Sequence, residues 1–226
     1  MEVKRYSCLE GAKQATGVTI IVDVFRAGNT ILSCFQNMVE AVIPVGNLKR
    51  AYELKDKYPN YYLAGERNSF PPEGFDFGNS PSEVSDFNLE DQTVILTSSA
   101  GTQGIIQADK ASRIFIATFG NAQSIVNYLT KLNPEVVSLV AMGFGSEEKA
   151  KEDETCTWYL EQKLKGKQVD FSSLKEMLLQ SEGAERLRRI GRRDDLEICL
   201  KPDVFHYIPE YDFQRKVLFN TFFPVN

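Results

Sequence analysis

The polar residues best suited to chemistry are concentrated in an irregular stretch between residues 61 and 81. Ala64-Gly65-Glu66-Arg67 follows the apolar run Tyr61-Tyr62-Leu63, which predicts the end of a buried strand. Gly-Phe-Asp-Phe-Gly-Asn-Ser-Pro then occupies residues 74–81. Loops of this length are uncommon in a compact domain unless they are functional or disordered, and the phenylalanines make disorder a poor fit. We therefore expect an ordered polar loop at a strand end, where α/β proteins build their sites.

Acids, arginines and hydroxyl groups also follow other apolar runs of the chain. Residues 17–24 form a nearly unbroken β-branched run, typical of a strand buried on both faces, with Asp23 and Arg26 at its end. Because the carboxyl ends of parallel strands share one rim of a sheet, the polar residues after each predicted strand are expected to converge. These residues are Asp23, Arg26, Glu66, Arg67, Asp76, Asn79, Thr97, Ser98, Ser99, Gly101, Thr102, Asn121, Gly143, Glu152, Asp153 and Glu154.

This combination of residue types suits a divalent cation bound together with a phosphate-like anion. Backbone N–H groups at helix N-termini bind an anion, and arginine donates paired hydrogen bonds to the oxygens of that anion. Carboxylates bind Mg²⁺. Each signal is weak alone, because Asp23 could be a helix cap and Thr97-Ser98-Ser99 could be ordinary turn chemistry. Jointly they favour a polyanion site.

Strand-like and helix-like segments alternate along the chain. Helices are expected over residues 26–38, 48–57, 122–132 and 149–165, with Asn121 in a position to cap the third. Strands are expected over residues 41–45, 93–97, 114–117 and 136–142. The alternation predicts an α/β fold with a mainly parallel or mixed central sheet. We expect one domain over residues 1–226, its C-terminal third being a small appended region or antiparallel edge strands.

Composition restricts the partners and the compartment. A net charge of −5 and a pI near 5.1 argue against broad binding to nucleic acid. No apolar run approaches the roughly 20 residues of a membrane helix, and the N-terminus lacks the apolar core of a signal peptide. The four cysteines are scattered, which favours reduced thiols over a structural zinc site. We therefore expect a cytoplasmic protein without nucleic-acid or membrane partners, and a homo-oligomer is left open.

Several phosphatase chemistries are excluded by counting residues. No cysteine is followed six positions later by the arginine of a cysteine phosphatase, and Phe25 stands where a haloacid-dehalogenase type needs its second aspartate. The chain has one histidine, His206, which lies in a predicted strand and is expected to be a packed or edge residue. The Walker motif of nucleoside triphosphatases is absent.

The basic segment at residues 186–193 has two interpretations. The favoured one is the exposed face of a basic helix, which is how charge runs usually behave. The other is an arginine lid over an anionic ligand, with Arg192 and Arg193 turning inward after Gly191.

The order of these motifs resembles the 2-phosphosulfolactate phosphatase family, over about residues 19–203. The motifs are Asp23-Val24-Phe25-Arg26-Ala27, residues 63–67, residues 74–81, residues 96–102 and Glu152-Asp153-Glu154-Thr155-Cys156. The resemblance implies a three-layer α/β/α fold and Mg²⁺-dependent hydrolysis of a phosphate monoester. The family substrate is 2-phosphosulfolactate, which yields sulfolactate and phosphate in coenzyme M biosynthesis. Ala100 and Gln103 replace an Asn and an Arg of the family turn, a change that would weaken the grip on a second anion such as a sulfonate.

The leading hypothesis is a Mg²⁺-dependent phosphatase acting on a small anionic phosphate ester. Direct attack by water is favoured over a covalent intermediate on Asp23. The expected catalytic residues are Asp23, Arg26, Glu66, Arg67 and Asp76, and the expected metal ligands are Asp23, Glu66, Asp76 and Asp153. Substrate binding is expected from Asn79, Ser80, Thr97, Ser98, Ser99, Gly101, Thr102 and Asn121. The alternative is a non-catalytic anion-binding or sensor protein that retains the pocket, and a nucleotide site at Gly143-Phe144-Gly145 rests on a lone Gly-x-Gly.

Overall fold

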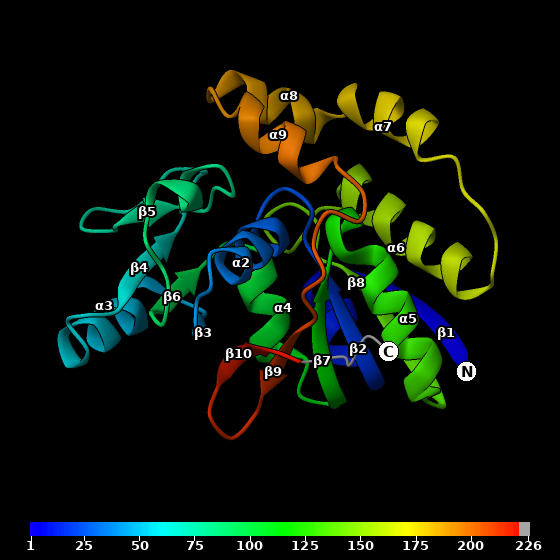
Figure 1. Cartoon of the computed structure of the whole chain (residues 1–226), viewed down its shortest axis with the longest axis horizontal. Helices are drawn as coiled ribbons and strands as arrows, with labels where there is room; N and C mark the ends of the chain where they lie inside the picture. The colour runs from blue at the N-terminus through cyan, green and yellow to red at the C-terminus, as the bar shows by residue number, and fades with distance from the viewer. Residues whose placement is uncertain (222–226) are drawn as a thin grey trace.

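The β-branched run near the N-terminus forms strand β2 (Gly17–Val22), which is buried on both faces as its composition predicts. In the computed structural model, which describes residues 1–221, β2 belongs to a ten-stranded sheet with helices on both faces (Figure 1). From one edge to the other the strands are β1 (Glu2–Ser7), β8 (Val136–Ala141), β2, β7 (Ala111–Ala117), β9 (Pro209–Asp212), β10 (Val217–Asn220), β3 (Ala41–Val45), β6 (Thr93–Thr97), β4 (Tyr62–Gly65) and β5 (Phe77–Gly78).

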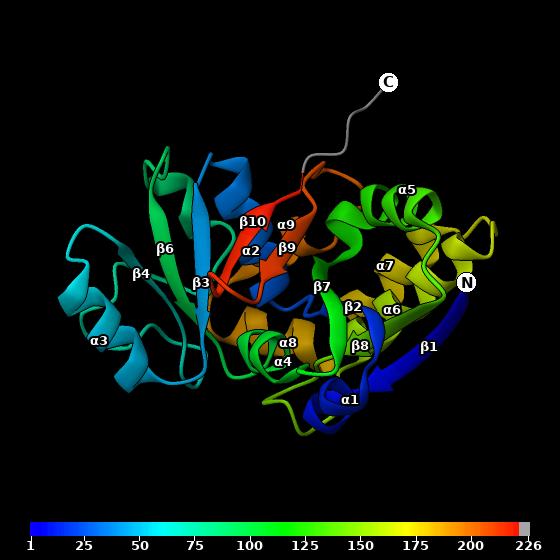
Figure 2. The ribbon, with the colours of Figure 1, turned by 90° about the horizontal axis from the view of Figure 1, so that it is seen from below.

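The sheet consists of two parallel blocks joined by an antiparallel hairpin. Strands β1, β8, β2 and β7 pair in parallel, and so do β3, β6, β4 and β5. The hairpin β9–β10 lies between β7 and β3, in the middle of the sheet (Figure 2). The expectation that C-terminal strands would lie at an edge is therefore wrong. Each hairpin strand has four residues, too few for periodicity to indicate its partners.

The central hairpin reverses the direction of the sheet. The three ladders from β7 to β3 are antiparallel, so the two blocks run in opposite directions where they join. In a flat sheet their carboxyl ends would lie at opposite rims, but a sheet twists progressively from strand to strand. Helix α4 (Gly101–Gln107), which follows β6, contacts both β2 and β3. The ends of β2 and β6 approach each other closely enough for residue 101 to hydrogen-bond residue 23.

Helices cover both faces of the sheet, which confirms the predicted α/β fold. Alternate residues of β2 face opposite sides, so Ile21 joins one hydrophobic core and Ile20 joins another. Helices α1 (Cys8–Gln14), α2 (Ala27–Gln36) and α4 contribute to the first core, and α5 (Ala122–Leu132) and α6 (Lys151–Leu164) to the second. Helix α3 (Leu48–Lys57) packs a smaller core against β3, β4 and β6.

Three C-terminal helices form an additional layer at the top of Figure 1: α7 (Phe171–Leu179), α8 (Glu182–Arg189) and α9 (Arg193–Cys199). Each buries a leucine in the second core, and α8 contacts α6, α7 and α9. Two short 3₁₀ turns, η1 (Glu83–Asp86) and η2 (Phe119–Asn121), complete the described elements. None of the helices within residues 1–221 combines the length and the apolar character needed to cross a membrane.

Candidate active site

A cavity of about 260 Å³ lies where the chain leaves β2, β4, β6 and β8, beneath helix α8. Four carboxylates line it, namely Asp23, Glu66, Glu152 and Asp153, and these are called the carboxylate floor below. Residues of and just after α8 line the other side, namely Gly183, Arg186, Leu187 and Ile190, and these are called the roof. The remaining lining residues are Phe25, Arg26, Asn68, Ser69, Asn79, Ser98, Ser99, Ala100, Gly143, Phe144 and Gly145.

Asp23 is fixed at the start of two helices. Its Oδ1 accepts a hydrogen bond from the Ala27 amide at 3.1 Å, and its Oδ2 accepts one from the Gly101 amide at 2.8 Å. Gly101 is needed for this approach, because a Cβ there would stand 2.8 Å from Asp23 Oδ2. The side chain is 5% exposed, and burial raises the pKa of Asp23 to about 7 against the effect of both hydrogen bonds. The charges of Glu66 and Glu152 add to this rise in the pKa.

Asp153 has a matching arrangement on the other side of β2. Its Oδ1 accepts from the Val24 amide at 2.7 Å, and its Oδ2 accepts from the Gly143 amide at 2.8 Å. Burial raises the pKa of Asp153 well above its ordinary value, and the nearby charges of Asp23 and Glu152 raise it further. Two buried acids therefore stand close enough to disfavour each other's ionised form, which is the environment that a cation relieves.

Glu66 joins the two loops that follow β4 and β6. Its Oε1 accepts from the Ser99 amide at 2.7 Å, and its Oε2 accepts from the Ser69 amide at 3.0 Å. Both carboxylate oxygens thus accept hydrogen bonds from backbone amides, and the side chain is buried at the cavity wall.

Glu152 lines the cavity, although the sequence did not predict it as a metal ligand or a catalytic residue. Burial raises the pKa of Glu152, and the charge of Arg186 opposes that rise. Within residues 1–221 no other residue hydrogen-bonds its carboxylate. The acidic run of residues 152–154 was visible in the sequence, but the run alone does not show which of its members face the sheet edge.

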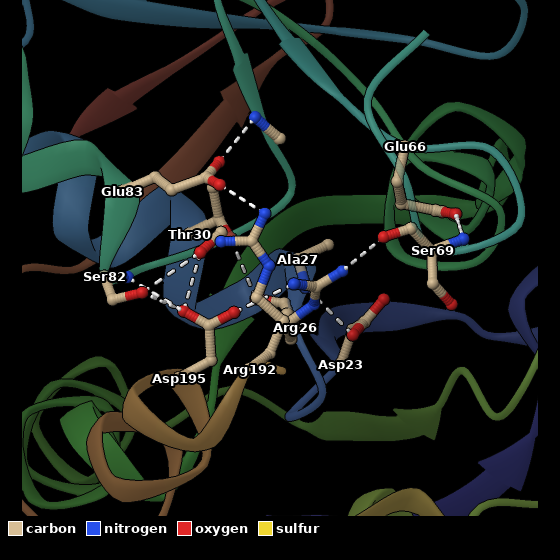
Figure 3. A network of polar contacts seen from close by, with 12 residues as sticks. Asp23, Arg26, Ala27, Thr30, Glu66, Ser69, Ser82, Glu83, Arg192 and Asp195 are labelled. Carbon is tan, nitrogen blue, oxygen red and sulfur yellow. Dashed lines mark hydrogen bonds and ion pairs between the residues drawn. The ribbon is translucent and has the colours of Figure 1, made fainter. Parts of the chain in front are cut away.

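Arg26 is held by a buried ion pair. Its Nη1 donates to Asp195 Oδ2 at 2.8 Å, and its Nη2 donates to the carbonyl oxygen of Ser69 at 3.1 Å (Figure 3). Asp195 Oδ1 also accepts from the Ser80 hydroxyl at 2.7 Å and from the Ser82 amide at 3.0 Å. Sequence reasoning missed Asp195, because an aspartate beside a run of arginines is typical of a solvated surface. In the structure its side chain is fully buried and links α9 to the loop after β5.

Arg67 does not line the cavity, in contrast to the prediction that it would bind the phosphoryl group. Its guanidinium donates to Thr97 Oγ1 at 2.8 Å, to the Glu66 carbonyl oxygen at 2.6 Å and to the Gly46 carbonyl oxygen at 3.4 Å. The side chain therefore ties the ends of β3, β4 and β6 together. Its neighbour Glu66 faces the cavity instead, because successive side chains along extended chain point to opposite sides.

Asp76 also lies outside the cavity, so the structure does not bring it to the other acids. Its Oδ2 accepts from the Leu63 amide at 2.7 Å and lies 3.5 Å from Lys55 Nζ. Asp76 immediately precedes β5, which pairs with β4 in parallel, and this register places it beside Leu63. Leu63 lies three residues before Glu66, a separation of roughly 10 Å along a strand. Asp76 is therefore a structural acid of the β4–β5 pair.

Five other predicted substrate-binding residues do not line the cavity and are hydrogen-bonded within the protein. Thr97 accepts from Arg67, Ser80 donates to Asp195, and the amide of Gly101 donates to Asp23. Asn121 donates to the carbonyl oxygens of Ile116 and Tyr207, both at 3.1 Å. Thr102 exchanges hydrogen bonds with Ser98. Asn79, Ser98 and Ser99 do line the cavity.

The turn at residues 98–102 binds carboxylates of the protein itself and not an anionic ligand. Its amides at Ser99 and Gly101 donate to Glu66 and Asp23, and those at Ser98 and Thr102 donate to each other's side chains. The expectation that these amides would bind phosphoryl oxygens is therefore corrected, because each already has a partner inside the protein. Ser99 and Ala100 remain as residues of this turn that line the cavity.

The basic segment begins within helix α8, as the favoured interpretation predicts, whereas the lid formed by Arg192 and Arg193 is not found and His206 is not in a strand. Arg192 pairs with Glu83 (Figure 3). Arg193 is exposed, and neither arginine lines the cavity. Arg186, earlier on the same helix, does line it. His206 lies in irregular chain with an exposed side chain, so its assignment to a strand is wrong.

The acids around the cavity do not form a complete metal site by themselves. Within residues 1–221 no three Asp, Glu, His or Cys side chains are grouped tightly enough to hold a metal ion by themselves. The predicted site with four protein carboxylates is therefore not formed. Mg²⁺, however, usually retains waters and binds one or two carboxylates together with substrate phosphate. The crowded acids of the floor and the buried Asn79 Oδ1, which has no hydrogen-bond partner, fit that kind of site.

The family model and the similar proteins that match this chain have the same description. Residues 6–214 match the family model described as 2-phosphosulpholactate phosphatase. A probable 2-phosphosulfolactate phosphatase of Carboxydothermus hydrogenoformans is 30% identical over 209 residues, which cover 87% of both chains. Proteins with the same description from Thermotoga petrophila and Clostridium beijerinckii are 31% and 27% identical. These two alignments cover 84% and 86% of this chain, and 87% and 88% of the relatives.

Proposed function

The chain belongs to the 2-phosphosulpholactate phosphatase family, a family of phosphoric monoester hydrolases, and we propose that its cavity performs this hydrolysis with Mg²⁺. The proposed substrate is the one in the relatives' names, 2-phosphosulfolactate, which would yield sulfolactate and phosphate. One observation carries the proposal: four buried acids from distant segments surround one cavity that also contains the Arg26 guanidinium.

Asp23 and Asp153 are the residues that would hold the ion. Each carboxylate oxygen already accepts one backbone hydrogen bond, which fixes its direction and leaves a second lone pair available. When bound, Mg²⁺ would neutralise charge on the phosphoryl group and help to activate water, effects worth several kcal/mol of barrier. The raised pKa values of both acids support this role, because a buried acid without a cation is costly in its ionised form.

The remaining polar groups have roles that follow from their surroundings. Arg26 would bind phosphoryl oxygens, and its direction is set by the ion pair with Asp195. Glu152 would accept the proton of the attacking water at its carboxylate, because no other residue hydrogen-bonds that group and its raised pKa favours proton uptake. The roof would exclude bulk water from the cavity, which strengthens every charge interaction inside it.

The alternative of a non-catalytic anion-binding protein rested on Ala100 and Gln103. Gln103 does not line the cavity, and its Nε2 donates to the carbonyl oxygens of Gly46 at 2.8 Å and Ser98 at 3.2 Å. The departure from the family turn at this position therefore removes no group from the cavity wall. Ala100 does line the cavity, but it leaves the four acids and Arg26 in place.

The test is phosphate release from 2-phosphosulfolactate after EDTA treatment, with and without added Mg²⁺. Asp23→Asn is compared with Asp76→Asn, which changes an acid of the same kind outside the cavity. We expect release only with Mg²⁺, a loss of at least a thousandfold in Asp23→Asn, and activity within about threefold of wild type in Asp76→Asn. Native activity in Asp23→Asn would contradict the assignment. Tight binding of the ester without phosphate release over hours would instead support the anion-binding alternative.

A further inference from the structure

The roof contains an arginine whose guanidinium has no polar partner. Arg186 lies over the ring of Phe144, with its Cζ 3.9 Å from the ring centroid. Within residues 1–221 the guanidinium makes neither a hydrogen bond nor an ion pair. Arg26, by comparison, already binds Asp195 and the Ser69 carbonyl oxygen. A half-buried guanidinium with all its donors unused, held in place by an aromatic ring, is suited to a planar or tetrahedral anion.

The position of Arg186 relates it to the reaction centre. Arg186 lines the same cavity as Glu152 and the other acids of the floor. Arg186 also lines a second cavity, of about 300 Å³, that adjoins the first through Phe144, Glu152 and Gly183. A ligand with its reacting end at the floor therefore has room to extend past Arg186.

The charge of the floor makes a second cation necessary for an acidic substrate. The carboxylate floor would repel the acidic groups of the substrate that are not engaged by the cation. Arg26 lies at the reacting end, so another cation is needed for the opposite end. Gln103 does not supply one, because its side chain holds Gly46 and Ser98.

We propose that Arg186, stacked on Phe144, is the subsite for a sulfonate group on the substrate and thereby selects sulfonated phosphate esters. The proposal rests on the proposed function, because it assigns the far end of the substrate whose phosphate lies at the floor. The guanidinium fork would donate two parallel N–H groups to sulfonate oxygens, a geometry that a lysine ammonium does not reproduce.

Three substrates separate the groups that Arg186 could recognise. They are 2-phosphosulfolactate, 2-phospholactate, which lacks the sulfonate, and 2-sulfoethyl phosphate, which lacks the carboxylate. The variants are Arg186→Met, Arg186→Lys and the control Arg189→Met, an exposed arginine of the same helix that pairs with Glu185. We expect Arg186→Met to lower kcat/KM for both sulfonated esters, mainly through KM, by at least ten times more than for 2-phospholactate. Arg186→Lys should recover part of this loss, and Arg189→Met should match wild type.

Two outcomes would overturn the subsite while leaving the proposed function intact. One is an equal loss on all three esters, or no loss on any, in Arg186→Met. The other is a loss confined to the two esters with a carboxylate, which would assign Arg186 to that group instead.

A binding measurement keeps the subsite separate from catalysis. Calorimetric titration with sulfolactate, which has no phosphate to lose, should show binding to wild type and at least tenfold weaker binding to Arg186→Met. If wild type hydrolyses none of the esters but this difference in binding is found, the proposed function fails and the subsite stands. If hydrolysis proceeds and sulfolactate binds both proteins equally, the subsite fails. Matching thermal unfolding of wild type and variant confirms that both are folded.

Discussion

The floor and the roof of the cavity are built in different ways. Asp23, Glu66 and Asp153 each accept two backbone hydrogen bonds, so their carboxylates are fixed by the ends of the strands and the helices that follow. Arg186 of the roof is held by one aromatic contact on a helix outside the sheet. The difference indicates that the strand ends of the sheet position the groups for the reaction, whereas helix α8 outside the sheet determines substrate specificity.

Asp153→Asn tests the second ion-binding acid of the floor. Its neighbour in sequence, Glu154, binds Arg5 and Ser7 away from the cavity, so Glu154→Gln is a matched control. We expect Asp153→Asn to lower kcat by at least a hundredfold, because it removes charge from the ion site, and Glu154→Gln to change kcat by less than threefold. Steady-state phosphate release at saturating Mg²⁺ measures both. Equal effects would mean that the floor is not the catalytic region.

Asp195→Ala tests the link that sets the direction of Arg26. The substitution leaves a buried guanidinium without its carboxylate partner and removes the acceptor of Ser80. We expect a loss of about 3–5 kcal/mol in the free energy of unfolding, measured with urea, since uncompensated buried charges are strongly destabilising. Exposed Asp194 on the same helix is the control, and Asp194→Ala should change stability by less than about 0.5 kcal/mol. A near-zero effect for Asp195→Ala would show that the ion pair is dispensable.

The protonation of Asp23 predicts a pH dependence of stability. Its pKa rises from 3.8 in the unfolded chain to about 7 in the folded protein, so the native state keeps a proton that the unfolded chain releases. Its contribution to stability is present below about pH 4 and is lost as pH rises to about 7. Without divalent ions, the difference in unfolding free energy between wild type and Asp23→Asn should therefore decrease over this window, by at most about 1.4 kcal/mol per pH unit. A difference that grows with pH would contradict the sign.

Gly183→Ala tests how closely the roof rests on the floor. A Cβ at Gly183 would stand 2.8 Å from Glu152 Cδ, so the Glu152 carboxylate must move. Because that carboxylate is the end of a flexible side chain, we expect little change in stability and roughly a tenfold decrease in kcat. Gly145→Ala is not a suitable control, because Gly145 has a positive φ of 59°. Unchanged kcat in Gly183→Ala would mean that the position of Glu152 is not critical.

Gln103→Met should have the smallest effect. The variant removes hydrogen bonds to two carbonyl oxygens behind the cavity and changes no lining residue. We expect KM for 2-phosphosulfolactate to change by less than twofold and stability to fall by about 1 kcal/mol. A tenfold rise in KM would show that this position contacts substrate after all.

The sequence predicted helices and strands well where a single continuous stretch of residues determines the element. The helix expected over residues 122–132 and the strands over 41–45 and 93–97 match α5, β3 and β6 at both ends. A β-branched run or an amphipathic period is sufficient for such elements. The hairpin β9–β10 could not be placed, because its neighbours β7 and β3 lie far away in sequence.

The site was predicted by position along each strand but not by side-chain direction. Asp23, Glu66 and Asp153 reached the cavity because they follow strand ends or begin a helix at the rim. Arg67 did not, because it is one residue further along the chain than Glu66 and its side chain points to the opposite side. Asp76 did not, because the pairing of β4 with β5 places it beside Leu63. Asp195 lacked any signal, because only the packing of α9 makes it a buried partner of Arg26.

A crystal structure of the protein grown with Mn²⁺ and inorganic phosphate would show whether Asp23 and Asp153 bind one ion together with phosphate. The anomalous signal of Mn²⁺ locates the ion independently of the surrounding density. We expect one ion bonded to both Asp23 and Asp153, with a phosphate oxygen among its ligands and Arg26 on another phosphate oxygen. An ion bound elsewhere, or phosphate bound without contact to the carboxylate floor, would contradict it.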